Sequence, residues 1–224
     1  VGSSTTPAKN IKQSQIQVND AEKHGVLIEQ LDQRQGSVIV FVKTKFGADR
    51  LATKLHKAGH EADAIHGDLQ QRRRDRVIQA FREKQFRILV ATDVAARGID
   101  IAKLPVVVNY DLPRSPAEYV HRIGRTGRAG ESGLAVSFVT PDMESHFRLI
   151  EKRQGQRVAR EQVPGFEVSD EQKAVPQVGE DETPAPKGLD PNGGIKGKRK
   201  SKKDKLREAA AAAAGAARPP EPEE

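Results

Sequence analysis

Apolar residues in the middle of the chain follow two spacings, one typical of strands and the other of helices. Short, almost wholly apolar runs predict strands at 38–42, 62–65, 88–91, 106–108 and 134–138. Apolar residues at helical spacing predict helices around 27–31, 48–58 and 77–81. Gly36 and Gly59 follow the first two of these helices. Glycine readily adopts the left-handed backbone that closes a helix, so we expect both helices to end there.

The predicted strands are apolar on both faces, which is typical of a parallel sheet covered by helices on each side. We therefore predict an α/β fold with an open, mainly parallel sheet between two helical layers. In such a sheet the functional residues lie in loops at the carboxyl ends of the strands.

The chain divides into three parts by composition. Residues 1–19 are a polar interdomain linker and lead-in strand, in which the later half of segment 11–18 alternates like a strand, and residues 20–164 carry the globular pattern. Residues 165–224 lack periodic apolar residues and include a basic segment at 196–207. We predict that this tail is disordered, because it cannot bury enough apolar surface to offset the entropy of ordering.

Composition excludes several classes of protein. No apolar run approaches the roughly 18 residues of a membrane span, so no membrane association is expected. The absence of cysteine excludes a disulfide scaffold, thiolate zinc sites and cysteine catalysis, and is compatible with a cytoplasmic location. The chain begins at Val1 without an initiator Met or a signal peptide, which suggests a fragment of a longer protein.

The charge balance predicts an anionic partner. The chain has 38 Lys and Arg against 31 Asp and Glu, a net charge of +7. Aromatic residues make up only 4%, with no Trp, so ladders of bases stacked on aromatic side chains are not expected. If nucleic acid binds, its phosphates and sugars should carry the contact.

The segment 121–128, His-Arg-Ile-Gly-Arg-Thr-Gly-Arg, is the most informative. Arg125 and Arg128 lie three residues apart, so both would leave one face if a helix beginning near Pro116 extends through them. Two adjacent guanidinium groups suit a phosphate. The alternative is a solvated basic helix face.

Two further segments follow predicted strands. In 91–100, Thr92 and Asp93 lie at a strand end, and the Asp100 carboxylate could accept hydrogen bonds from ribose hydroxyls. The alternative is that Asp93 caps a short helix and pairs with Arg97.

In 66–74, Gly67 and the amides after it could form a phosphate nest, with Arg74 reaching from the first helical turn. The alternative role of this segment is a helix cap by Asp68.

In order and spacing, these segments resemble the conserved blocks of the second, C-terminal RecA-like domain of DEAD-box RNA helicases, nearest the bacterial RhlE-type branch. The resemblance runs from 38 to 166. It includes motif IV at 40–44, the QxxR element at Gln71 and Arg74, motif V at 92–100 and motif VI at 121–128. It implies a RecA-like three-layer sandwich with a mainly parallel central sheet.

The resemblance also implies roles for individual residues. Arg125 and Arg128 match arginine fingers that reach the γ-phosphate of ATP, and Gly98 and Asp100 match positions that contact its ribose. His121 matches a residue that links the cleft to the other domain. The positions that match an RNA-binding surface are Thr44, Gly67, Gln71, Arg74, Thr92, Arg97 and Gly98.

The family's nucleotide-binding motifs do not occur in this chain. Residues 193–199 only superficially resemble a Walker A loop, and 180–183 are no Walker B motif. His56 and His60 are not expected to bind metal, because Gly59 ends the helix between them. The resemblance therefore implies that ATP and Mg²⁺ are held mainly by an N-terminal RecA-like domain, and that this chain alone is inactive.

The implied function is one half of an ATP-dependent RNA helicase that unwinds short RNA duplexes or remodels RNA–protein complexes. An alternative is a non-enzymatic RNA-binding module that acts mainly through segment 196–207. A DNA helicase of a related family fits the motifs less closely.

Overall fold

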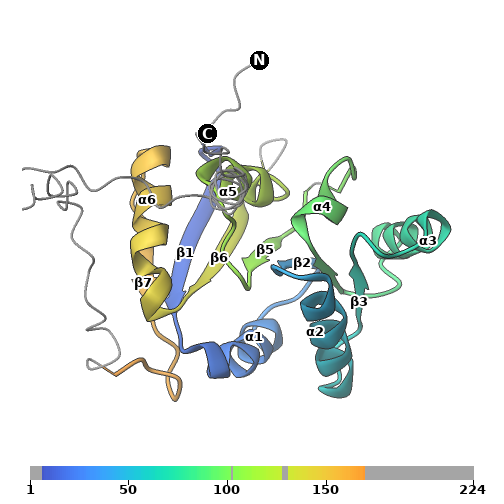
Figure 1. The fold of residues 1–224 in the computed structure, drawn as a ribbon, viewed down its shortest axis with the longest axis horizontal. Helices are drawn as coiled ribbons and strands as arrows, with labels where there is room; N and C mark the ends of the chain where they lie inside the picture. The colour runs from blue at the N-terminus through green and yellow to red at the C-terminus, as the bar shows by residue number, and fades with distance from the viewer. Residues whose placement is uncertain (1–6, 102, 128–130, 170–224) are drawn as a thin grey trace, which may run out of the picture. The chain divides into compact units, whose positions relative to one another are not determined.

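The computed structural model describes residues 7–101, 103–127 and 131–169, all within the unit Val1–Gln177 (Figure 1). Its helices are α1 (Lys23–Asp32), α2 (Lys45–Lys57), α3 (Gln71–Arg82), α4 (Asp93–Ala96), α5 (Pro116–Ile123) and α6 (Glu144–Gln154). Single 3₁₀ turns, η1 (Asp20–Glu22) and η2 (Pro141–Met143), precede α1 and α6. Its strands are β1 (Ile11–Gln17), β2 (Val38–Phe41), β3 (Ala62–Ile65), β4 (Ile88–Ala91), β5 (Val106–Asn109), β6 (Gly133–Val139) and β7 (Ala159–Glu161).

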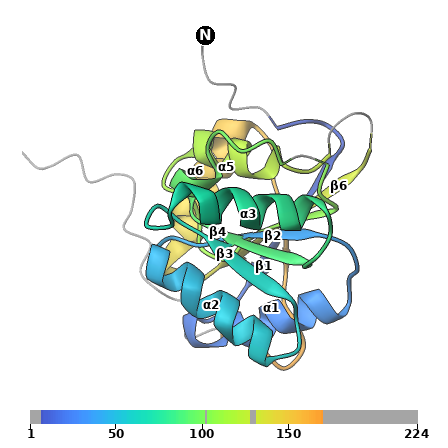
Figure 2. The ribbon, with the colours of Figure 1, turned by 90° about the vertical axis from the view of Figure 1, so that its right-hand side faces the viewer.

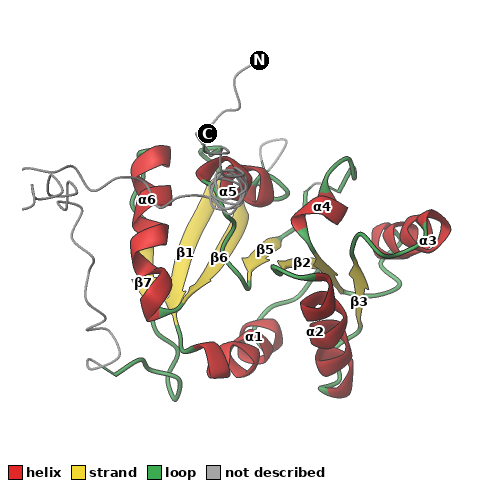
Figure 3. Cartoon of the chain, in the orientation of Figure 1, coloured by secondary structure: helices red, strands yellow, loops and turns green. Residues whose placement is uncertain are grey.

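These strands form one sheet in the order β3-β4-β2-β5-β6-β1-β7 (Figure 3). Every pair is parallel, and Val40 lies between Val90 and Val108 in the centre of the sheet. The predicted strands are confirmed, and so is the parallel sheet. Gly36 and Gly59 have φ angles of 87° and 88°, as the predicted helix ends require.

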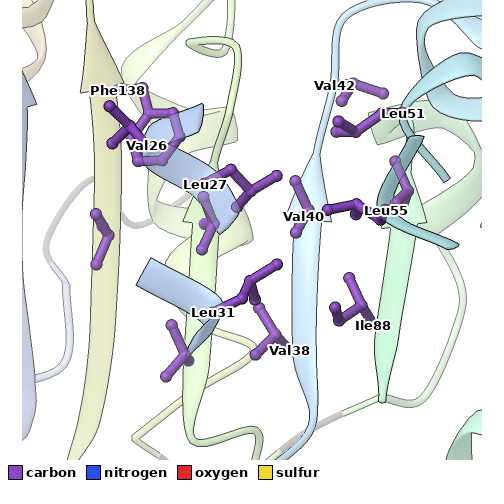
Figure 4. Packing of buried hydrophobic residues seen from close by; sticks show 14 of the residues in the cluster. Val26, Leu27, Leu31, Val38, Val40, Val42, Leu51, Leu55, Ile88 and Phe138 are labelled. Carbon is purple, nitrogen blue, oxygen red and sulfur yellow. The ribbon is translucent and has the colours of Figure 1, made fainter. Parts of the chain in front are cut away.

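Helices cover both faces of the sheet, so the predicted three-layer sandwich is confirmed. Val38 and Val40 pack with α1 and α2, whereas Ile39 and Phe41 pack with α3 and α4, because successive strand residues point to opposite faces. Figure 4 shows the first of these clusters, with Leu27, Leu31 and Leu55 against the strands. In Figure 2, α1 and α2 lie below the sheet and α3, α5 and α6 above it.

The region around β1 differs most from the sequence-based expectations. The lead-in strand lies inside the sheet, between β6 and β7, and its residues Gln13, Ser14 and Gln15 are buried. Gln13 accepts hydrogen bonds from the Tyr119 hydroxyl at 2.7 Å and from the Gln154 amide at 3.0 Å. Neither α6 nor β7 was predicted.

Ion pairs to one arginine join β7 to α6. Arg160 of β7 pairs with Glu144 and Glu151, both on α6, at 2.6 and 2.8 Å. Although burial alone would raise the pKa of Glu151, hydrogen bonds from Arg160 and from the Val158 amide lower it. Polar contacts therefore replace part of the apolar packing at this end of the sheet.

Several predictions concern residues outside the described ranges. These are the role of Arg128, the segments 180–183 and 193–199, and the tail from 170 onward with its basic segment 196–207. The predicted disordered tail begins at 165, but Phe166 packs on the first cluster and Val168 is buried, so the prediction is wrong for 165–169. No helix among the described residues is long and apolar enough to cross a membrane.

Candidate functional site

Three expected RNA-binding residues lie along one rim of the sheet. Thr44, Gly67 and Thr92 follow the carboxyl ends of β2, β3 and β4, which are neighbouring strands. The parallel sheet therefore brings together segments that are far apart in the sequence, as the rule for open α/β sheets predicts. We call this edge the β2–β4 rim.

The rim is organised by side chains that hold the loops. The Thr44 hydroxyl accepts a hydrogen bond from the Gly47 amide at 3.0 Å and so caps α2. Lys45 pairs with Asp68 at 2.6 Å, and this hydrogen bond lowers the pKa of Asp68. The alternative role of Asp68 as a helix cap is wrong, since α3 has Gln70 at its N-cap position. Gly67 is exposed at this rim.

Three arginines hold the loop that carries motif V. Arg74 of α3 donates to the carbonyls of Ala95 and Arg97, and Arg82 donates to that of Asp100 at 2.8 Å. Arg125 donates to three further carbonyls, those of Ala96, Ile99 and Ile101. Arg74 and Arg125, which the resemblance assigned to RNA and ATP, are thus engaged with backbone oxygens of residues 95–101 in this structure.

A buried ion pair that the sequence did not indicate joins motif V to motif VI. Arg122, only 3% exposed, donates to both carboxylate oxygens of Asp93, at 2.7 and 2.6 Å. The same guanidinium donates to Asn109 Oδ1 and to the Asp111 carbonyl, and lies 5.0 Å from the centre of the Phe41 ring. In the sequence, only the position of Arg122 among the cations of segment 121–128 indicated a role for it. Nothing in the sequence indicated that Asp93 is its partner.

The alternative pairing of Asp93 with Arg97 is therefore wrong. Thr92, rather than Asp93, stands at the N-cap of α4. Arg97 pairs with Glu118 of α5 at 3.1 Å, because Glu118 is held near it by the turn that begins α5. In that turn the Ser115 hydroxyl accepts a hydrogen bond from the Glu118 amide.

The expectation that Arg125 and Arg128 leave one helix face required a helix through both residues, and α5 does not reach Arg125. Helix α5 ends at Ile123, and Gly124 is its C-cap. Gly127 has a φ of 63° and packs closely against Ile11, so the backbone turns away from the helix before Arg128.

A pocket of about 380 Å³ opens beside this loop. Its lining includes His121, Arg122 and Arg125 from motif VI and Arg97 from motif V. An adjoining hollow of about 700 Å³ shares Asp93, Arg97, Glu118 and Arg122 with it and extends to Thr92 and Lys43. In the wall of this hollow, Lys23 pairs with Asp111 at 3.0 Å.

Of the remaining candidates, Gly98 and Asp100 are exposed on the motif V loop, where Gly98 has a φ of 74°. Gln71 is exposed at the start of α3 and donates to Asp75 at 2.7 Å. The pocket thus gathers His121, Arg97 and Arg125, whereas Gln71 lies on another element.

Within residues 7–101, 103–127 and 131–169, no three His, Asp or Glu side chains gather as they would around a metal ion. His60 pairs with Asp32 at 2.9 Å.

Comparison with known proteins agrees with the motifs. Residues 22–130 match the family model described as the helicase conserved C-terminal domain. The chain is 44% identical over 158 residues to the ATP-dependent RNA helicase CshA of Listeria monocytogenes. It is 45% identical over 156 residues to the DEAD-box ATP-dependent RNA helicase CshA of Geobacillus kaustophilus. These matches cover 70% and 69% of this chain but only 30% and 33% of the relatives, so the chain spans about a third of their length.

Solved structures agree with this match. The C-terminal domain of the DEAD-box protein Dbp5 is 44% identical with a TM-score of 0.63, and the match covers 68% of this chain and 91% of that one. Dbp5 of S. cerevisiae bound to RNA and ADP BeF₃ is 43% identical with a TM-score of 0.65, over 70% of this chain and 42% of that one.

Proposed function

Because the chain belongs to the C-terminal, RecA-like helicase domains of DEAD-box proteins, we propose that it forms one half of an ATP-dependent RNA helicase. In this proposal an N-terminal RecA-like domain holds ATP and Mg²⁺, and this domain completes the site. The substrate is single-stranded RNA or a short RNA duplex. Because the curated relatives that it matches are bacterial, we propose a cytoplasmic location, and we propose the RhlE-type branch as its subfamily.

The observation that carries the proposal is the pocket beside the motif V loop. It is lined by His121 and by the guanidinium groups of Arg97, Arg122 and Arg125. Asp93 and Glu118, which also line the pocket, pair with Arg122 and Arg97. Arg125 donates to the carbonyl of Ala96. A pocket lined by several guanidinium groups suits a polyphosphate. Arg125 and Arg128 would stabilise charge on the γ-phosphate, and Gly98 and Asp100 would contact the ribose.

The β2–β4 rim supports the RNA part of the proposal. Thr44 offers an exposed hydroxyl and Gly67 an exposed backbone along one edge, and such groups bind phosphates and sugars. Thr92 is buried but lines the adjoining hollow. Arg97 is exposed just after α4, and Gln71 is exposed at the start of α3, four residues after Gly67. Contacts to the sugar-phosphate backbone of RNA would make binding tolerant of the RNA sequence.

The motif V loop offers a physical route for coupling ATP to RNA. Thr92, proposed to contact RNA, and Asp100, proposed to contact ATP, belong to one short segment held by Arg74, Arg82 and Arg125. If each ligand touches both domains, each favours the closed pair, and hydrolysis of ATP reopens it. Closure would bend the bound RNA and release one strand of a short duplex.

The isolated chain is expected to hydrolyse no ATP above background, with or without RNA. It contains no Walker A loop and no DEAD carboxylates, so nothing in it positions the triphosphate for in-line attack. The measurement is phosphate release from purified chain with ATP, Mg²⁺ and single-stranded RNA. The control adds the N-terminal domain of a DEAD-box relative in cis, which should restore RNA-stimulated turnover. Robust turnover by the chain alone would contradict the proposal.

Removal of segment 196–207 distinguishes the helicase from the rival function, a tail-driven RNA-binding module. We expect the truncated chain to bind RNA more weakly. A plot of the logarithm of the RNA-binding constant against the logarithm of salt concentration should also become less steep. Its slope should fall by about 0.7 for each RNA phosphate that the segment no longer neutralises. Binding isotherms at several salt concentrations give this slope. Loss of all RNA binding on truncation would favour the rival.

A further inference from the structure

One aromatic side chain, that of Phe46, is largely exposed to solvent. The chain has seven Phe, two Tyr and no Trp, and all nine aromatic residues lie in the described ranges. Eight of them are buried or half-buried, whereas Phe46 is 76% exposed. Exposed apolar surface is unfavourable in water, so a ring held outward in this way is suited to a contact with a ligand or partner.

Phe46 lies on the β2–β4 rim. It occupies the first turn of α2, two residues after Thr44, whose hydroxyl caps the helix. The Lys45 ammonium lies 5.4 Å from the centre of the Phe46 ring and pairs with Asp68 from the loop after β3. The ring is therefore placed beside both segments, Thr44 and Gly67, that the proposed RNA path follows.

Cations continue from Phe46 along α2. Arg50, Lys54 and Lys57 follow at helical spacing and are exposed. Among the described residues, none of these three forms an ion pair, and the nearest carboxylate in sequence, Asp49, is occupied by His66 at 2.9 Å. A strand that leaves the rim past Phe46 would thus meet positive charge.

We propose that Phe46 is a stacking platform for one nucleobase at the point where RNA leaves the β2–β4 rim, with Arg50 contacting the adjacent phosphate. The proposal deepens the proposed function and rests on it. Every base has a π-face, so a single platform adds affinity without demanding a sequence. The stacked base also covers the exposed Phe46 ring with an apolar surface, and Lys45 stays close to the stacked base and ring. The general expectation of backbone contacts stands, with one base contact added.

The test compares binding of an oligouridine of about ten nucleotides by the 224-residue chain and by three variants. Phe46→Ala is expected to weaken binding about tenfold, within the range for loss of one base–aromatic stack. Phe46→Tyr is expected to bind like the unaltered chain, because tyrosine keeps the ring. Leu149→Ala removes another exposed apolar side chain, on α6, and is expected to have no effect.

An oligonucleotide with abasic sites isolates the stacking contribution. It keeps the phosphates but lacks bases, so the unaltered chain and Phe46→Ala should bind it equally. A 5-iodouridine probe irradiated on the unaltered chain should form a crosslink that mass spectrometry maps to Phe46.

Each other outcome overturns the proposal in a recognisable way. Equal binding of oligouridine by Phe46→Ala and the unaltered chain rejects the stacking role but leaves the proposed function intact. Equal weakening on intact and abasic oligonucleotides shows that Phe46 acts through the backbone or the fold. If the unaltered chain, and also the chain joined to an N-terminal domain, binds no RNA even at low salt, the proposed function fails together with this inference.

Discussion

Replacing Arg128 with alanine is expected to lower kcat for ATP hydrolysis by about 10³–10⁵ in a protein that joins this domain to an N-terminal nucleotide-binding domain. This is the range for loss of an arginine finger, whose charge acts on the γ-phosphate only in the transition state. RNA binding should change little, because Arg128 is not assigned to the RNA surface. Steady-state phosphate release and fluorescence anisotropy with labelled RNA measure the two quantities.

Arg125→Ala provides the contrast. Arg125 donates to the carbonyls of Ala96, Ile99 and Ile101, so its removal also frees the motif V loop. We expect this variant to lose ATP hydrolysis and RNA binding together, since Thr92 belongs to the same segment. Comparable loss of both activities in Arg128→Ala would instead mean that Arg128 is assigned to the wrong ligand.

Replacing Arg122 with alanine is expected to lower the free energy of unfolding by about 3 kcal/mol, the lower end of the cost of removing one partner of a buried ion pair, because the Asp93 side chain is 25% exposed. The change leaves the Asp93 carboxylate without its bidentate donor and removes the contact with the Phe41 ring. It also leaves the Asn109 side chain and the Asp111 carbonyl without this donor. Urea denaturation of the isolated chain, followed by circular dichroism, measures the change.

Arg97→Ala is the matched control for this experiment. Arg97 is exposed and pairs with Glu118 at the surface, so its loss should cost no more than about 1 kcal/mol. If Arg122→Ala were as stable as Arg97→Ala, the buried pair could not be what holds motif V against motif VI.

The fold was largely predictable because its strong signals are local. The runs 38–42 and 88–91 are apolar throughout, and a strand buried on both faces requires that composition wherever it lies in the sheet. β1, α6 and β7 were harder, because at this end of the sheet Gln13, Glu151 and Arg160 are satisfied through hydrogen bonds and ion pairs. α6 buries Phe147 and Ile150, but its polar Glu151 and Gln154 are buried with them, which weakens the apolar signal.

The candidate site was predictable as a set of loops but not as a set of contacts. Thr44, Gly67 and Thr92 could be assigned to one rim because parallel strands end at one edge. The bonds of Arg74 and Arg125 to motif V carbonyls, and the exposure of Phe46, could not be assigned. A guanidinium on a long side chain reaches many acceptors, and sequence spacing does not choose among them.

The sequence alone therefore determined the central strands, helices α1, α2 and α3 and the family, since apolar periodicity and motif spacing are properties of neighbouring residues. Only the tertiary structure decided which carboxylate Arg122 pairs with, where α5 ends relative to Arg125 and which aromatic ring faces solvent. These features depend on segments dozens of residues apart that meet only after the sheet has assembled, and their energies come from burial and distance in three dimensions.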